Sequence, residues 1–155
     1  MVHSTRRLPD DFRLGLALLA RRRWRAAAHH FQLAGRGLRR GQPAHDLCLS
    51  YQGLALVYAG DVSGLNLCRH VAARDSRQPD IYANLALAEL RLRHRRRAWE
   101  ALSRGLALDE SHARLRQVAR IMGTRRRPVV PFLRRDNPLN RWLGRATYAR
   151  RRGAK

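Results

Sequence analysis

The 155-residue chain contains little lysine, little acid and little cysteine. Lys155 is its single lysine, and 11 Asp and Glu residues stand against 33 basic residues, so the formal net charge is +22. Its two cysteines, Cys48 and Cys68, exclude a disulfide framework and a cysteine-rich zinc module. No apolar run approaches the roughly 20 residues that a transmembrane helix needs.

Arginine is what the chain has in excess. A surface of this charge repels copies of itself and favours an anionic partner, which the charge alone leaves open among nucleic acid, anionic lipid and an acidic protein face. The hydrophobic content of 45% excludes a wholly disordered chain. The length suits one domain, or a small domain with a tail.

The beginning of the chain does not predict a secretory signal. Its longest apolar run, residues 14–20, is short and is followed by Arg21–Arg23, where a signal peptide would have a small-residue cleavage site. We therefore expect a cytoplasmic protein with reduced cysteines. Peripheral attachment to a membrane or residence in a complex stays open.

Helical periodicity dominates the sequence and predicts an all-α fold. Apolar residues recur three and four positions apart, as in Leu14, Leu18 and Leu19, and no segment alternates as a half-buried strand does. Short breaks at residues 21–23, 60–61 and 94–96 predict turns within helix pairs. Prolines after residues 41–42 and 76–78 predict boundaries between pairs.

The predicted helix pairs are similar to one another. Residues 79–112 fit a 34-residue pattern with Tyr82 at an aromatic site, Ala86 at a small site and Gly105 near the end of the second helix. Gly15 and Gly53 occupy the same small site in two earlier copies. The middle copy departs from the pattern, because Leu65 and Arg69 stand where small and large apolar residues are usual.

These features resemble the tetratricopeptide repeat family, with three repeats over about residues 8–112. The resemblance implies a right-handed solenoid of helical hairpins. A further helix over residues 111–122 is expected to cap its last face, and Gly123 is a suitable stop. We expect residues 1–7 to be an extension, residues 8–122 to be the repeat domain, and residues 123–155 to be a tail.

The tail carries a net charge of +10 beside apolar residues. Prolines bracket residues 128–133, which predicts an extended segment, and Asp136–Asn137 before Pro138 predicts the start of a short amphipathic helix. Its expected anchors are apolar residues with adjacent arginines. They are Val129, Val130, Phe132, Leu133, Arg134, Arg135, Leu139, Trp142, Leu143 and Arg145.

Nothing in the sequence indicates an enzyme, a cofactor or a metal. The glycines at positions 35, 37 and 41 have the wrong spacing for a phosphate loop, and the seven histidines do not pair with Asp, Glu or Cys at a metal-binding spacing. Cys48 and Cys68 are expected to be small buried hydrophobes. A small-molecule substrate is not expected.

Two surfaces are candidates for partner binding. The family resemblance implies a concave groove lined by the first helix of each pair; here it is apolar and does not support a clamp for a terminal carboxylate. The groove sites are Phe12, Leu16, Leu19, Ser50, Leu54, Val57, Tyr58, Ala83, Leu87 and Leu90. The same sites could instead pack within the solenoid or against the tail. The second surface is a basic edge formed by Arg21, Arg22, Arg23, Arg95, Arg96 and Arg97, because both triplets adjoin equivalent turns.

The expected function is a non-enzymatic protein-interaction scaffold, as an accessory subunit or assembly factor of a larger complex. The apolar groove is expected to hold the partner, and the Arg-rich tail is expected to dock on an acidic surface of that partner. Arginine binds phosphate and carboxylate alike and does not separate these partners. Two alternatives therefore stay open: association with RNA or another nucleic acid, and attachment to an anionic membrane.

Overall fold

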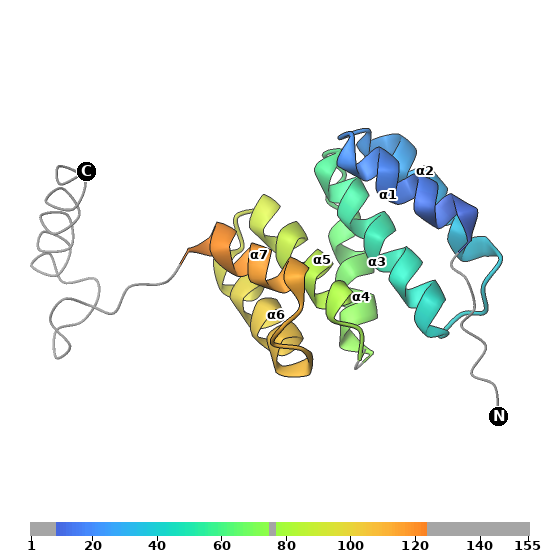
Figure 1. Cartoon of the computed structure of the whole chain (residues 1–155). Helices are drawn as coiled ribbons and strands as arrows, with labels where there is room; N and C mark the ends of the chain where they lie inside the picture. The colour runs from blue at the N-terminus through green and yellow to red at the C-terminus, as the bar shows by residue number, and fades with distance from the viewer. Residues whose placement is uncertain (1–8, 75–76, 124–155) are drawn as a thin grey trace, which may run out of the picture. The chain divides into compact units, whose positions relative to one another are not determined.

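The computed structural model describes residues 9–74 and 77–123, and these residues fold into helices without a strand (Figure 1). The described residues up to Met122 belong to one compact unit. The helices are α1 (Asp10–Ala20), α2 (Trp24–Arg36), α3 (Pro43–Tyr58), α4 (Gly64–Ala73), α5 (Pro79–Arg91), α6 (Arg95–Leu108) and α7 (Ala113–Met122). The prediction of an all-α fold is confirmed for this part of the chain.

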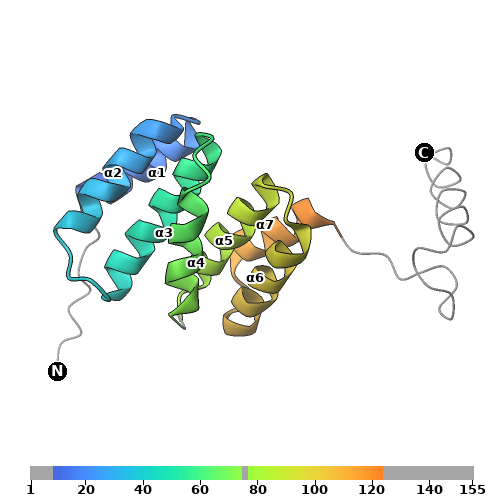
Figure 2. The same cartoon turned by 180° about the vertical axis from the view of Figure 1, so that it is seen from behind.

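The helices form three consecutive pairs and a final single helix. Within each pair the helices pack against each other, and α2 also packs against α3, α3 and α4 against α5, and α5 and α6 against α7. The turns inside the three pairs lie along the upper edge in both Figure 1 and Figure 2, and the linkers between pairs lie along the lower edge. We call the upper edge, residues 21–25, 59–63 and 91–97, the turn edge.

Proline marks the start of the first helix in each pair. Pro43 and Pro79 are the first residues of α3 and α5, and Pro9 immediately precedes α1. Proline suits this position because its fixed φ is helical and its missing N–H would have no partner there. The first helices and α7 begin at residues 10, 43, 79 and 113, which are 33, 36 and 34 residues apart.

The predicted boundaries differ from the observed ones by a residue or two. Helix α7 begins at Ala113 rather than Ser111, because Asp109 accepts a hydrogen bond from the Ser111 N–H (2.9 Å) and holds residues 109–111 in a turn. The turn between α5 and α6, predicted at residues 94–96, ends at His94, and Arg95 is the first residue of α6. A side-chain hydrogen bond in the preceding turn sets the start of α7, and the backbone turn at Arg93 sets the start of α6; helical periodicity reports neither.

The three turns on the turn edge share one backbone motif. In the first turn the Arg23 N–H bonds to the Leu18 carbonyl (2.9 Å) and the Arg22 N–H bonds to the Leu19 carbonyl (3.0 Å). The same pair of bonds follows α3 and α5, with Gly60 and Arg93 at the position of Arg22. This is the Schellman arrangement, whose central residue adopts a left-handed conformation. Accordingly, φ is +59° at Arg22, +94° at Gly60 and +63° at Arg93.

Replacing Arg22 with glycine should stabilise the protein. An L-residue with a side chain is strained at a φ of +59°, and relief of that strain outweighs the extra freedom of glycine in the unfolded chain, by roughly 0.5–1 kcal/mol. Arg21→Gly is the matched control, because Arg21 has a φ of −83° and glycine there only adds unfolded-state entropy. Urea denaturation should give a higher midpoint for Arg22→Gly and a lower one for Arg21→Gly; the reverse order would contradict the assignment.

The small residues predicted from the repeats face the second helix of their own pair. A Cβ added at Gly15 would lie 2.8 Å from the Phe31 ring in α2, and one added at Gly53 would lie 2.5 Å from the Gly64 carbonyl oxygen in α4. Ala86 is fully buried against the third pair. The common small site therefore corresponds to the closest approach of the paired helices.

An aromatic cluster joins the first pair to the second. The ring of Phe12 in α1 contacts Phe31 in α2 (centroids 5.4 Å apart) and Tyr51 in α3 (5.3 Å), and the Phe31 and Tyr51 rings lie 5.2 Å apart. Phe31 is fully buried. Such clusters add specific edge-to-face contacts to the burial of apolar area, and this cluster holds the first pair against α3 of the second pair.

Within residues 9–74 and 77–123 no helix is long and apolar enough to cross a membrane.

Candidate interaction surface

Half of the residues predicted to line a groove lie in the core. Their exposed fractions are 3% for Phe12, 0% for Ser50, 1% for Leu54, 2% for Val57 and 0% for Ala83. These side chains pack between successive helices, so they are closed to a partner. The apolar groove predicted from the repeat register is therefore much smaller than expected. The remaining positions are partly buried or exposed: Leu16, Leu19, Tyr58, Leu87 and Leu90.

A polar network occupies the face shared by α3, α5 and α7. The Arg114 guanidinium of α7 donates to Asp80 (2.5 Å) and to the Asn84 side-chain carbonyl (2.7 Å), and it lies 4.9 Å from the centre of the Tyr51 ring. Asn84 in turn donates to the Ser50 hydroxyl (3.0 Å). Burial raises the pKa of Tyr51 to about 12. Buried Asn84 and Ser50 therefore both find partners, and the network joins three helices.

The two arginine triplets lie at exposed turns on the turn edge. Arg21–Arg23 connect α1 to α2, and Arg95–Arg97 form the first turn of α6. The structure adds arginines that sequence reasoning missed, Arg25, Arg91 and Arg93, all of them exposed. Their positions could have indicated them, since each stands within three residues of a predicted turn.

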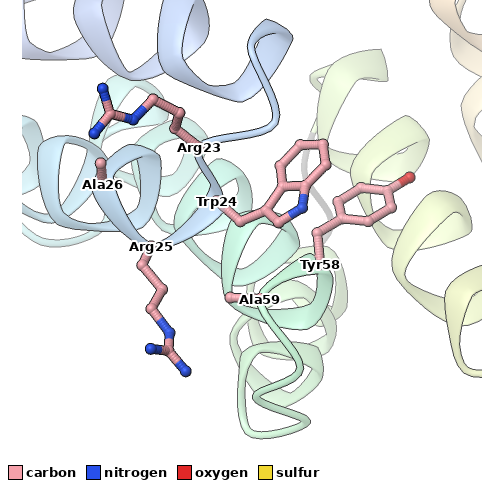
Figure 3. A pocket seen from close by; sticks show the side chains of 6 residues that line it. All are labelled: Arg23, Trp24, Arg25, Ala26, Tyr58 and Ala59. Carbon is pink, nitrogen blue, oxygen red and sulfur yellow. The ribbon is translucent and has the colours of Figure 1, made fainter.

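The first turn borders an open cavity of about 450 Å³ (Figure 3). The Trp24 ring stacks on Tyr58 at the end of α3, with centroids 4.9 Å apart and planes inclined by 24°. Arg23 and Arg25 flank this stack, and Figure 3 shows their guanidinium groups extending away from the rings in different directions. The stack holds the first turn beside the second and leaves both guanidinium groups free to contact another molecule.

A second open cavity, of about 730 Å³, lies at the third turn. Its lining is almost entirely basic, from Arg93 to Arg97, with Glu100 as the single acidic member. Glu100 pairs with Arg96 (3.1 Å), and Arg95 donates to the Met122 carbonyl at the end of α7. Arg93 and Arg97 have no such protein partner among the described residues.

Carboxylates neutralise few of the arginines on the turn edge. Among the described residues, ion pairs with Asp or Glu involve Arg13, Arg69, Arg74, Arg96 and Arg114. Only Arg96 of these belongs to the turn edge. Moreover, α2 and α6 begin without a side-chain cap and with no acid in the first turn. Arginines there face the positive end of the helix dipole, which costs stability and leaves the local potential strongly positive.

The cysteines carry no reactive thiol. Cys48 and Cys68 are buried, as predicted, and burial raises their pKa values to about 11 and about 12. Thiols at such pKa values are protonated at neutral pH and are poor nucleophiles.

The predicted tail anchors lie outside the described residues. This applies to Val129, Val130, Phe132, Leu133, Arg134, Arg135, Leu139, Trp142, Leu143 and Arg145.

Comparison of the chain with protein-family models, with curated proteins and with solved structures gives no match.

Proposed function

We propose that this protein is a non-enzymatic scaffold of the tetratricopeptide type that docks on an acidic surface of a protein partner, as an accessory subunit or assembly factor of a complex. The observation that carries the proposal is the turn edge, where the arginines of the first and third turns are exposed and, among the described residues, all but Arg96 lack a carboxylate partner. The basic tail adds a second contact with the same partner.

This arrangement of arginines lowers the stability of the free protein, and an acidic partner would offset that cost. Like charges gather at two uncapped helix N-termini, and two arginines adopt a left-handed backbone conformation that glycine tolerates better. An acidic surface offsets the repulsion, and a guanidinium binds a carboxylate through two parallel hydrogen bonds. The aromatic stack of Trp24 and Tyr58 and the packed helix pairs hold the edge rigid, which lowers the entropy lost on binding.

Removing the charges of the first turn should weaken binding to an acidic peptide about tenfold. The variant carries Gln at Arg21, Arg22, Arg23 and Arg25, and the probe is a labelled polyglutamate peptide at low ionic strength, measured by fluorescence anisotropy with the full-length chain. Four exposed contacts of roughly 0.3–0.5 kcal/mol each account for this factor.

The matched control carries Gln at Arg36, Arg39, Arg40 and Arg77, which are exposed and lie on or beside the linkers between pairs. It loses the same charge from the opposite edge, so its affinity should fall by no more than about twofold from the general field alone. Equal losses in both variants would contradict the proposal. So would a turn-edge variant that loses binding to single-stranded RNA or to anionic vesicles while it keeps its affinity for the peptide.

A further inference from the structure

The turn edge is not uniformly basic. Its middle turn, Gly60–Ser63, contains no arginine and instead carries the Asp61 carboxylate and the Val62 side chain, which is 64% exposed. The first turn carries Arg21–Arg23 and Arg25, which we call the first arginine pole. The third turn carries Arg91, Arg93, Arg95 and Arg97, the second arginine pole.

Asp61 both forms part of the middle turn and gives that turn a negative charge. One Asp61 carboxylate oxygen accepts a hydrogen bond from the Ser63 N–H at 2.9 Å, an arrangement that closes the turn before α4. Hydrogen bonds from the Ser63 side chain and backbone lower the pKa of Asp61, so the group is a carboxylate at neutral pH. It is fully exposed and forms no ion pair with a described arginine.

The middle turn lies between the two poles. On one side, Trp24 of the first turn stacks on Tyr58, two residues before Gly60. On the other side, Tyr58 and Leu92 of the third turn pack in the same apolar cluster, and the charge of Arg91 opposes the rise in the pKa of Tyr58. Both views of the fold show the second turn between the first and third along the upper edge (Figures 1 and 2). The order of charge along the edge is therefore positive, negative with an apolar contact, and positive.

This order distinguishes between polyanions. A nucleic-acid strand carries one charge at every nucleotide, so a strand that crosses both poles brings phosphates close to Asp61. A protein surface can place acids at two points and leave a neutral or apolar residue between them, opposite Asp61 and Val62. Complementary charge placement selects partners largely by making the wrong ones repulsive.

We propose that the two arginine poles bind two separate acidic clusters on one protein partner, with an uncharged residue of that partner between them, and that Asp61 discriminates against a continuous run of negative charge. This inference rests on the proposed function and specifies the partner's surface. Neighbouring packed helices lie about 8–10 Å apart, so two successive turns place roughly 20 Å between the poles. An extended peptide spans that distance in about six residues.

Two peptides of identical composition test the inference. The split peptide has two glutamate triplets separated by about six neutral residues, and the block peptide joins the triplets into one run flanked by the same neutral residues. The wild-type full-length chain should bind the split peptide about three- to fivefold more tightly, the scale expected when one exposed like-charge contact is avoided. Because the tail is the same in every variant, its contribution to the preference between the peptides is the same in each, and a change in preference between variants reports the turn edge alone.

The decisive variant is Asp61→Asn. Asparagine keeps the side-chain oxygen that accepts from the Ser63 N–H, so the turn is retained while the charge is lost. The preference for the split peptide should shrink to within about twofold because the block peptide binds more tightly. Asp109→Asn is the matched control: Asp109 accepts from the Ser111 N–H at 2.9 Å in an equivalent turn, but it lies between α6 and α7 on the opposite edge. It should keep the wild-type preference.

Each result separates this inference from the proposed function. Equal affinity of the wild type for both peptides, tighter binding of the block peptide, or an unchanged preference in Asp61→Asn would overturn the inference. The variant with Gln at Arg21, Arg22, Arg23 and Arg25 is the first-pole variant. If it nevertheless binds both peptides about tenfold more weakly than the control with Gln at Arg36, Arg39, Arg40 and Arg77, the proposed function stands and only this inference fails. If the first-pole variant binds as the wild type does, both fail.

Discussion

Replacing Glu89 with alanine should lower the free energy of unfolding by about 2–3 kcal/mol. The Glu89 side chain is 3% exposed and receives three hydrogen bonds, from Arg69 Nε (2.8 Å), from the Arg69 terminal nitrogen (3.1 Å) and from His94 Nδ1 (2.8 Å). Removal of one partner from a buried ion pair costs about 3–5 kcal/mol. The side chains of Arg69 and His94 are 37% and 43% exposed and regain water when Glu89 is removed. The expected loss therefore lies at or just below the lower limit of that range.

Glu100→Ala is the control for Glu89→Ala. Glu100 also pairs with an arginine, but its side chain is 55% exposed and that of Arg96 is 93% exposed, so its loss should change stability by no more than about 0.5 kcal/mol. Denaturant unfolding followed by circular dichroism at neutral pH measures both variants. A loss of similar size in the two would show that the buried pair contributes no more than a surface pair.

The second large effect is expected at Gly53. A methyl group there would lie 2.5 Å from the Gly64 carbonyl oxygen and 2.8 Å from Cys68 Sγ, and the first of these atoms belongs to the backbone of α4. Backbone atoms cannot rotate away, so Gly53→Ala must separate α3 from α4. Overpacking of a tight core costs typically 1–3 kcal/mol, and we expect the upper part of that range, about 2–3 kcal/mol.

Gly35→Ala is the matched control for Gly53→Ala. Gly35 lies within α2, and an added Cβ would meet only Cys48 Cβ at 3.7 Å, which is an ordinary contact. Alanine stabilises a helix interior relative to glycine, so this variant should gain about 0.4–1 kcal/mol. Thermal melts should therefore move in opposite directions for the two variants. A Gly53→Ala protein as stable as the wild type would mean that the two helices can separate without cost.

Glu89 also accounts for one of the two residues that depart from the predicted pattern in the second helix pair. The pattern predicts a large apolar residue at position 69, and in the structure Arg69 extends from α4 to the carboxylate of Glu89 in α5. Its charge neutralises a carboxylate that the next pair buries. The contact also ties the second pair to the third turn through His94.

The placement of the helices could be predicted from the sequence because its signals are local. Proline at the start of α3 and α5, glycine or arginine runs at the turns and the recurrence of apolar residues each act within a few residues of the chain. The small sites at Gly15 and Gly53 were predicted from their common place in the repeat pattern, which aligns them with Ala86. A glycine in a helix is not enough by itself, because a Cβ added at Gly35 of α2 would meet only Cys48 Cβ at 3.7 Å.

The groove could not be predicted in the same way. Leu54 and Val57 lie on the expected face of α3, yet the neighbouring helices cover them. Whether such a face is open depends on the angle and offset between successive pairs, which depend on side chains such as Phe12 and Tyr51 from different helices. The network around Arg114 was missed for the same reason, since its partners Tyr51 and Asp80 lie 63 and 34 residues away in the chain.

The sequence by itself determined the all-helical class, the three pairs with their final helix, and the large excess of arginine, because periodicity, turn residues and composition are properties of neighbouring residues. Only the tertiary structure decided how the charged side chains are distributed over the surface that a partner contacts. Stacking of the pairs brings turns 38 and 33 residues apart in the chain, at Arg22, Gly60 and Arg93, onto one edge. It also buries Glu89 and leaves Asp61 exposed between two groups of arginines. Electrostatic potential depends on distance in space, and that distance is set by packing.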